Sequence, residues 1–236
     1  LEYHMEKKAD ITIVCANAEG EDVSRFGTIK MNDEGQIVEF EEKPSVSDHE
    51  YISTGVYVIR RRLLIDLIEE AAEEGKFDFV KDILVRYKNV KKMCGYVIDT
   101  YWSNIATIDA YYQTNMDFLK SDVRKHFWRE YPPVYSKVTD LPPAKYNPGS
   151  SVKNSLVSSG CIVNGTVDNS LLFKKVFVGN NCVIKNSIIL NDVYLGDNIY
   201  IENCIVEAHS TLRANSRHVG EGEIKIVVEE GERYDW

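Results

Sequence analysis

The sequence predicts an α/β domain followed by a left-handed parallel β-helix. Strand-like and helix-like apolar patterns alternate over residues 1–120, whereas the later part repeats about every 17 residues, with apolar positions returning every five or six. A proline-rich stretch separates the two textures and predicts a linker. The expected domains are therefore residues 1–125 and 146–236, joined by the linker at 126–145.

The first part of the chain has the patterns of short strands and amphipathic helices. Strand-like runs occupy residues 11–16, 26–31, 36–40 and 55–60. Gly35, in the turn between the second and third runs, supplies the positive φ that a β-hairpin favours. Helical spacing marks the opening residues, and a second helix is expected from Leu63 to about Gly75. A third begins after Thr107, whose side chain can cap it.

The repeat beyond the linker predicts the β-helix. Residues 176–189 recur 17 positions later as 193–206, and thirteen of the fourteen positions keep their general character. An Asn-Ser-apolar-apolar element also starts at Asn154 and Asn169, so about four coils are visible. Returns every five or six positions fit neither a helix nor an ordinary strand, but they fit a triangular solenoid whose aliphatic side chains fill the core. Asparagine suits its corners because it tolerates the left-handed region.

Composition excludes several classes of function. A net charge of −9 disfavours nucleic acid and anionic membranes as partners, since both need a basic face. No apolar stretch approaches the ~20 residues that span a bilayer, and the opening residues do not resemble a signal peptide. The five cysteines lack any C-x-x-C pair and mostly lie in apolar runs, which favours reduced core thiols and a cytoplasmic location.

Two motifs in the first part could bind a phosphorylated sugar. Glu42 and Lys43 precede a proline at the end of the hairpin strand. An extended backbone there would hold Lys43 where its ammonium group can bind a phosphate, while the carboxylate of Glu42 accepts from a sugar hydroxyl. Ser53 and Gly55 lie at a strand edge where a ligand could approach the backbone closely. Taken alone, a sequence such as that of Glu42 and Lys43 is more often a solvated turn, and tight packing explains Ser53 and Gly55 equally well.

Taken in order, the motifs resemble the glucose-1-phosphate adenylyltransferase (ADP-glucose pyrophosphorylase) family. That family's S-R-F-G, E-F-E-E-K-P, S-M-G-I-Y, D-F-G-K-D and Y-W-x-D-I-G-T motifs are similar to residues 24–27, 39–44, 53–57, 78–82 and 101–107. The resemblance covers nearly the whole chain. It implies the C-terminal portion of a GT-A-like nucleotidyltransferase domain, followed by the left-handed β-helix. It also implies that Glu42 and Lys43 contact glucose 1-phosphate and that Ser53 and Gly55 line the sugar site.

The chain departs from the family pattern in two ways. The family's G-G-x-G-x-R-L nucleotide loop and its S-G-D segment are not found, which predicts that the chain is a fragment with an upstream part missing. Asn104 occupies the position of a metal-ligating aspartate, and a neutral amide is a poorer Mg²⁺ ligand than a carboxylate. Mg²⁺ is therefore expected in the full-length family enzyme, but neither a cofactor nor a catalytic residue is expected in this chain.

The Asn104 substitution is typical of the D-type subunit, a paralogue that assists or regulates a catalytic partner in glycogen synthesis. The resemblance thus predicts a non-catalytic or weakly catalytic subunit that assembles with a catalytic homologue or with itself. Three alternatives stay open. The protein could be an active pyrophosphorylase that tolerates Asn104, or an assembly module in which Lys43 binds nothing. A hexapeptide acyltransferase is disfavoured, because His209 and His218 lie only at the end of the repeat.

Overall fold

The computed structural model describes residues 1–130 and 134–229. The chain forms two compact units, Leu1–Trp102 and Ser103–Trp236.

The first unit is built on a five-stranded mixed sheet of order β3-β2-β4-β1-β5. Its strands are β1 (Ile11–Asn17), β2 (Gly27–Met31), β3 (Ile37–Glu42), β4 (Tyr51–Ile59) and β5 (Met93–Val97). All neighbours pair antiparallel except β1 and β5. Gly35 turns the β2–β3 hairpin with a φ of +79°, as predicted. Strand β4 starts at Tyr51, earlier than predicted, because a bulge interrupts its alternation.

Helical segments pack against this sheet and complete its core. They are α1 (Glu2–Glu6), the 3₁₀ helix η1 (Val23–Arg25), α2 (Arg61–Glu73) and the π-helix η2 (Phe79–Val85). Leu67 and Ala71 of α2 pack with Ile13 and Phe40 of the sheet. The helix ends before Gly75, whose φ of +71° confirms the expected stop. Strand β5 and the π-helix were not predicted, because their apolar runs are too short to show a period.

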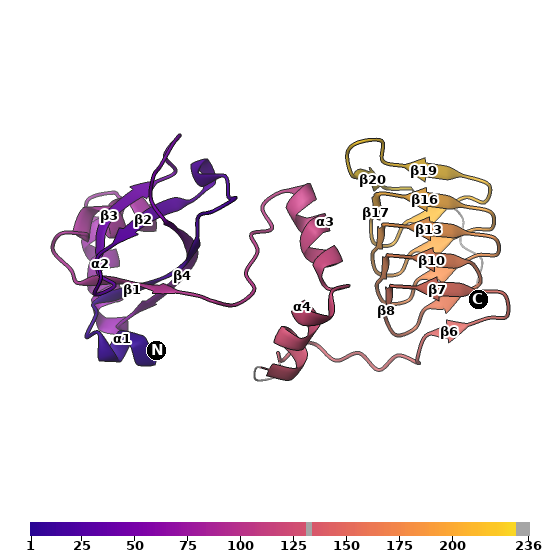
Figure 1. The fold of residues 1–236 in the computed structure, drawn as a ribbon, viewed down its shortest axis with the longest axis horizontal. Helices are drawn as coiled ribbons and strands as arrows, with labels where there is room; N and C mark the ends of the chain where they lie inside the picture. Colours follow the sequence, from indigo (N-terminus) through magenta and orange to yellow (C-terminus); the bar gives the residue numbers. More distant parts are fainter. Residues whose placement is uncertain (131–133, 230–236) are drawn as a thin grey trace. The chain divides into compact units, whose positions relative to one another are not determined.

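The second unit contains a parallel β-solenoid of about five turns. Three five-stranded sheets form its sides, and each strand pairs with the strand one coil further on, as Figure 1 shows for β7, β10, β13, β16 and β19. The strands are β6 (Lys145–Tyr146), β7 (Ser151–Lys153), β8 (Leu156–Val157), β9 (Ile162–Val163), β10 (Thr166–Asp168), β11 (Leu171–Leu172), β12 (Phe177–Val178), β13 (Val183–Lys185), β14 (Ile188–Ile189), β15 (Tyr194–Leu195), β16 (Tyr200–Glu202), β17 (Cys204–Val206), β18 (Thr211–Leu212), β19 (Arg217–Val219) and β20 (Lys225–Val227).

The repeating residues take the places that their spacing predicted. The aliphatic residues that recur every five or six positions are at most 1% exposed: Val178, Ile184, Ile189, Leu195, Ile201, Val206 and Leu212. At one corner, Asn154, Asn169 and Asn186 are left-handed, with φ values of 42°, 47° and 45°. Each donates from Nδ2 to Oδ1 of the next, at 2.7 and 2.8 Å. Hydrogen bonds between the side-chain amides of neighbouring coils therefore stabilise the left-handed backbone at this corner, which is energetically unfavourable for most other residue types.

A helix packs on the outside of the solenoid. Helix α3 (Ile108–Asp117) is capped by Thr107, as predicted, whose Oγ1 accepts from the amide of Ala110. Its aromatic residues Tyr111 and Tyr112 pack on the apolar surface of β11, β14 and β17, and the hydroxyl of Tyr112 donates to the carbonyl of Asn186 at 2.7 Å. Packing therefore assigns the residues from Ser103 onward to the solenoid unit, although the sequence pattern placed them with the α/β domain.

The expected linker at 126–145 is partly helical. After α4 (Ser121–Lys125), residues His126–Glu130 form the π-helix η3, because the prolines of this stretch begin only at Pro132. Residues 131–133 lie outside the described residues, and 134–144 contain neither helix nor strand. The domain limits near 125 and 145 stay predictions.

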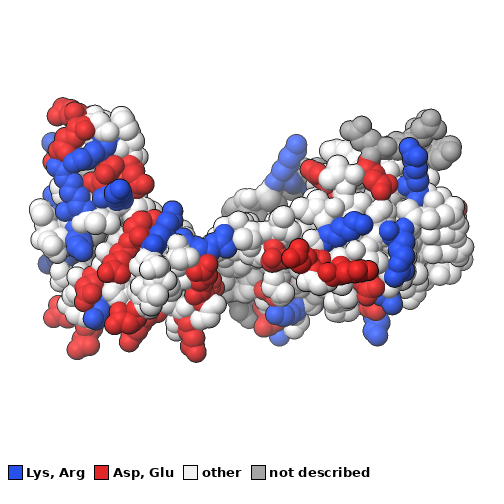
Figure 2. Space-filling view, turned by 90° about the horizontal axis from the view of Figure 1, so that it is seen from above, with Lys and Arg blue, Asp and Glu red and all other residues white. Residues whose placement is uncertain are grey.

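Other sequence expectations concern cysteines, charge and membranes. All five cysteines are free and buried, as predicted. Figure 2 shows acidic and basic side chains interspersed on the face in view. Within the described ranges, no helix is both long and apolar enough to cross a bilayer.

Candidate functional site

Three of the strands bring a carboxylate, a glycine and a hydroxyl into one row at the edge of the first sheet. Glu42, the last residue of β3, pairs with Gly27 of β2. The β2–β4 register pairs Thr28 with Ile52, and one more step places Ser53 beside Gly27. Paired residues share a face, so the side chains of Glu42 and Ser53 flank Gly27, and the ring of Phe40 lies over this glycine. A Cβ atom on Gly27 would lie only 3.0 Å from Glu42 Oε2.

A tyrosine and a second carboxylate lie close to this row. The hydroxyl of Tyr57 is 3.5 Å from Ser53 Oγ, and its ring packs against Phe79 at 5.2 Å between centroids. Burial raises the pKa of the Tyr57 hydroxyl, the contact with Ser53 opposes this, and the charges of Glu42 and Asp78 raise it further. Asp78 is fixed by capping the π-helix η2, where its Oδ1 accepts from the amide of Lys81 at 2.8 Å. Tyr57 is thus a neutral hydroxyl between two carboxylates.

Lys43 adopts a backbone conformation that the sequence did not predict. Its φ is +50°, so the expected extended backbone before Pro44 is wrong. The amide of Lys43 still donates to the carbonyl of Phe26 at 2.9 Å, which extends the β2–β3 pairing by one residue before the chain turns away. Left-handed φ at a lysine costs about 1–2 kcal/mol. Its side chain is 62% exposed and its Nζ lies 3.6 Å from Glu42 Oε1, so the ammonium group stays near the row.

Gly55 lies in the bulge of β4. Between the pairs Ile13–Tyr57 and Cys15–Ser53, β4 has three residues where β1 has one. Gly55 takes a φ of +78°, and its amide donates to Ser53 Oγ at 3.3 Å. The bulge therefore brings Tyr57 back toward Ser53, and the glycine orients the serine hydroxyl.

The structure thus places Glu42 and Lys43 at the end of β3, Ser53 opposite Glu42 across β2, and Gly55 two residues further along β4. Carboxylate and hydroxyl groups at this edge can exchange hydrogen bonds with a polyol, and the ammonium group can bind an anion. Sequence reasoning identified Gly27 only as a strand-edge glycine that a ligand could approach, and assigned no role to Tyr57 or Asp78. All three lie inside the matched motifs, but only the strand register shows that they share a site.

Asn104 belongs to the second unit and is half-buried. Nearby, Ser103 Oγ and Thr114 Oγ1 are 2.6 Å apart, which ties this segment to α3. The residues present do not fit Mg²⁺, which prefers carboxylates. Asn104 offers a neutral amide, and among the described residues no three histidines, cysteines or acids gather where they could hold a metal ion.

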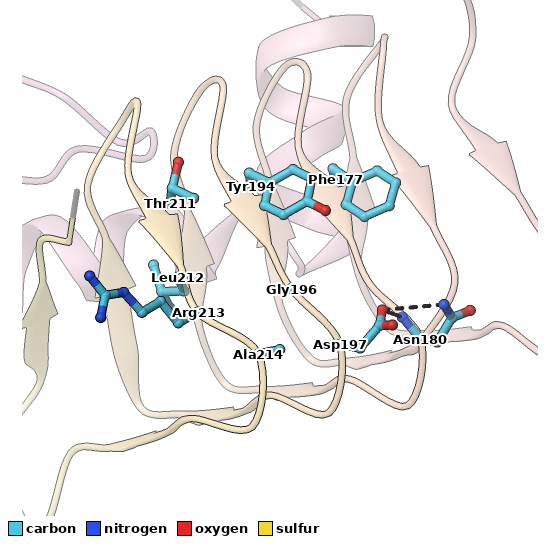
Figure 3. A pocket seen from close by; sticks show the side chains of 9 residues that line it. All are labelled: Phe177, Asn180, Tyr194, Gly196, Asp197, Thr211, Leu212, Arg213 and Ala214. Atoms are coloured by element: carbon cyan, nitrogen blue, oxygen red, sulfur yellow. Dashed lines mark hydrogen bonds between the residues drawn. The ribbon is translucent and has the colours of Figure 1, made fainter. Parts of the chain in front are cut away.

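The solenoid has a hollow of about 730 Å³ on the side formed by β12, β15 and β18, which no sequence pattern predicted. Figure 3 shows Phe177 and Tyr194 along one wall; their rings stack 4.8 Å apart at an angle of 5°. On the other side, Asp197 Oδ1 accepts from the amide of Asn180 at 2.7 Å. Both pairs join equivalent positions of neighbouring coils, so they stabilise the stack.

Comparisons with known proteins cover both units. A family model described as nucleotidyl transferase matches residues 1–121, and one described as GlmU-like, C-terminal hexapeptide, matches residues 142–225. The glucose-1-phosphate adenylyltransferase of Clostridium botulinum (strain Alaska E43 / Type E3) is 39% identical over 189 residues, which are 78% of this chain and 49% of that protein. The Bacillus subtilis (strain 168) protein of the same name is 35% identical over 187 residues, with the same shares. The chain therefore spans about half the length of the curated relatives it matches.

Proposed function

Because the chain belongs to the nucleotidyl transferase family, we propose that it is a sugar-phosphate-binding subunit of a glucose-1-phosphate adenylyltransferase in glycogen biosynthesis, with little or no catalytic activity of its own. That reaction converts ATP and glucose 1-phosphate to ADP-glucose and pyrophosphate. The site around the end of β3 would hold glucose 1-phosphate, and a catalytic homologous subunit would carry out the nucleotidyl transfer.

The row formed by Glu42, Gly27 and Ser53 is the observation that carries this proposal. The carboxylate of Glu42 and the hydroxyl of Ser53 can exchange hydrogen bonds with a sugar, and the neutral hydroxyl of Tyr57 can donate to it. Lys43 lies at the exposed end of the row, where its ammonium group can pair with the phosphate.

The position of Asn104 supports the non-catalytic part of the proposal. In the related motif this position carries a metal-ligating aspartate, and the residues here do not fit Mg²⁺. The residues around the end of β3 bind and orient the sugar phosphate.

Calorimetric titration with glucose 1-phosphate tests the binding part. We expect Lys43→Ala to weaken binding at least about tenfold, since a charge-assisted contact contributes about 1.5–3 kcal/mol. Lys8→Ala is a matched control, because Lys8 is also an exposed lysine of the first unit with a left-handed φ, of 48°. If Lys43→Ala binds like Lys8→Ala, or if the unchanged chain does not bind, the chain is an assembly module and the sugar-phosphate site is refuted.

Turnover tests the subunit role. ADP-glucose formation is measured with the protein alone, with a catalytic homologue alone and with both together. We expect the mixture to exceed the sum of its parts, or to respond differently to effectors. Robust turnover by the protein alone would instead identify an active pyrophosphorylase. The variant Asn104→Asp also distinguishes these two possibilities. In an active pyrophosphorylase it should change the turnover rate little, whereas in the proposed subunit it should produce Mg²⁺-dependent turnover.

A further inference from the structure

One side of the solenoid carries charges of alternating sign, one on each rung. Lys153, Asp168, Lys185 and Glu202 hold the same position in β7, β10, β13 and β16, and the strand register pairs each with the next. Their neighbours Val167, Ile184 and Ile201 are fully buried, so the four charged side chains point outward. We refer to these four residues as the charge ladder.

The four side chains of the charge ladder form no ion pair within the described part of the chain. Neighbouring rungs are about 4.8 Å apart, yet no ion pair joins any of the four side chains to another group in the described part of the chain. Glu202 accepts a hydrogen bond from the Tyr200 hydroxyl at 2.7 Å, and the ammonium group of Lys185 lies 6.0 Å from the Tyr200 ring centroid. The charges are therefore held on the face and are available to a partner.

We propose that this face docks onto the same face of a second copy of the chain, with the two solenoids antiparallel. A two-fold axis in the face, parallel to the strands and between β10 and β13, reverses the order of the rungs. Lys153 then meets Glu202 of the partner subunit, and Asp168 meets Lys185 of the partner subunit. All four contacts join opposite charges. A two-fold axis running along the ladder would instead place like charges together at every rung, so the ladder favours the antiparallel orientation.

The second outward column fits the same arrangement. Ser151, Thr166, Val183 and Tyr200 occupy the other outward position of these strands. The two-fold axis places Tyr200 against the small Ser151 of the partner subunit, and Val183 against Thr166 of the partner subunit. Tyr200 therefore meets a much smaller side chain, Val183 and Thr166 are similar in size, and neither position brings two bulky groups together.

The size of the face predicts a weak contact. The four paired rungs, about 4.8 Å apart with strands of three residues at about 3.3 Å each, give roughly 190 Å² per copy. The total of roughly 400 Å² is well below the ~1,200 Å² of stable interfaces. The contact should therefore form only at high protein concentration, or should orient copies that other contacts already hold together. Because its charged side chains are half-buried or exposed, salt should weaken it. This inference does not depend on sugar-phosphate binding.

Exchanging charges between two variants tests the proposal by sedimentation at high protein concentration and low salt. Asp168→Lys or Lys185→Asp alone places two like-charge contacts in the dimer, and each should weaken self-association at least about tenfold. An equimolar mixture of the two variants restores every opposite-charge pair, so it should associate as the unchanged protein does, and high salt should abolish the association. Arg213→Glu, an exposed charge reversal on another side of the solenoid, should have no effect.

The mixture also controls for folding, because a variant that failed to fold could not restore association. Cysteine trapping gives the register independently: Thr166→Cys mixed with Val183→Cys should form a disulfide faster than either variant alone. A mixture that associates no better than its components, or single variants that associate like the unchanged protein, would overturn the proposal. So would an unchanged protein that stays monomeric and binds only a homologous subunit.

Discussion

Replacing Gly27 by alanine should perturb both the core of the first unit and the candidate site. The added Cβ would lie 2.7 Å from Phe40 Cζ and 3.0 Å from Glu42 Oε2. Carbon atoms prefer separations of about 3.5–4.0 Å, so the Phe40 ring must move by roughly 0.8 Å. Phe40 is only 3% exposed and cannot move into solvent. Overpacking of this kind costs about 1–3 kcal/mol, and displacement of Glu42 should also weaken sugar-phosphate binding.

A double-mutant cycle with Phe40→Leu isolates the steric part of this effect. Urea unfolding of the first unit is followed by the fluorescence of Trp102, which packs on Phe26 at 5.9 Å between centroids, with Trp128 and Trp236 replaced by phenylalanine. The smaller leucine side chain should recover about 1 kcal/mol or more of the free energy of unfolding lost in Gly27→Ala. Gly55→Ala is the control, because no atom lies within 4 Å of its added Cβ and only its φ of +78° is strained. It should be additive with Phe40→Leu. Additivity of Gly27→Ala with Phe40→Leu to within about 0.5 kcal/mol would refute the steric reasoning.

Three further predictions concern the solenoid core, one surface carboxylate and one thiol. Ile201→Ala should lower the free energy of unfolding of the second unit by about 2–5 kcal/mol, because Ile201 is fully buried. Ile226→Ala is the control, because Ile226 is exposed. If urea titrations gave the same loss of unfolding free energy for both variants, the packing of Ile201 would be contradicted. Hydrogen bonds from Arg86 and then Lys76 lower the pKa of Glu74 to about 2. Stability from this group is therefore present above its ordinary pKa of 4.5 and is lost as pH falls through about 2, so Glu74→Gln should reduce the acid dependence of unfolding, and an unchanged profile would count against the pairing. Burial raises the pKa of the Cys15 thiol to about 12, so a thiol reagent at pH 8 should label it only after unfolding, and rapid labelling of the native protein would disprove its burial.

The solenoid was predictable because its sequence repeats. In a stack of identical coils, each core position recurs after a fixed number of residues, so Ile184 and Ile201 identify one another without any knowledge of the fold. The asparagine corners follow for the same reason, since one residue type at one position reports one backbone conformation. No comparable pattern predicted where helix α3 packs, because an apolar stripe such as that of Tyr111 and Tyr112 shows that a helix is covered but not what covers it.

The candidate site was predictable as a set of motifs but not as an arrangement. Glu42, Lys43, Ser53 and Gly55 were identified from their order along the chain. Their convergence depends on the β2–β3 and β2–β4 registers, which no local pattern specifies. The left-handed φ of Lys43 was missed because the following proline favours an extended backbone, whereas the hydrogen bond between the Lys43 amide and the Phe26 carbonyl continues the sheet up to the turn.

By itself the sequence determined the two kinds of fold, the solenoid core, the reduced cysteines and the residues of the candidate site. These depend on periodicity and side-chain chemistry, which are local properties of the chain. The tertiary structure alone decided that Gly27 lies between Glu42 and Ser53, that Tyr57 lies near Ser53, and that alternating charges face outward on successive rungs. Each of these depends on which strands are neighbours and in what register, and long-range pairing leaves no periodic signal in the segments that it joins.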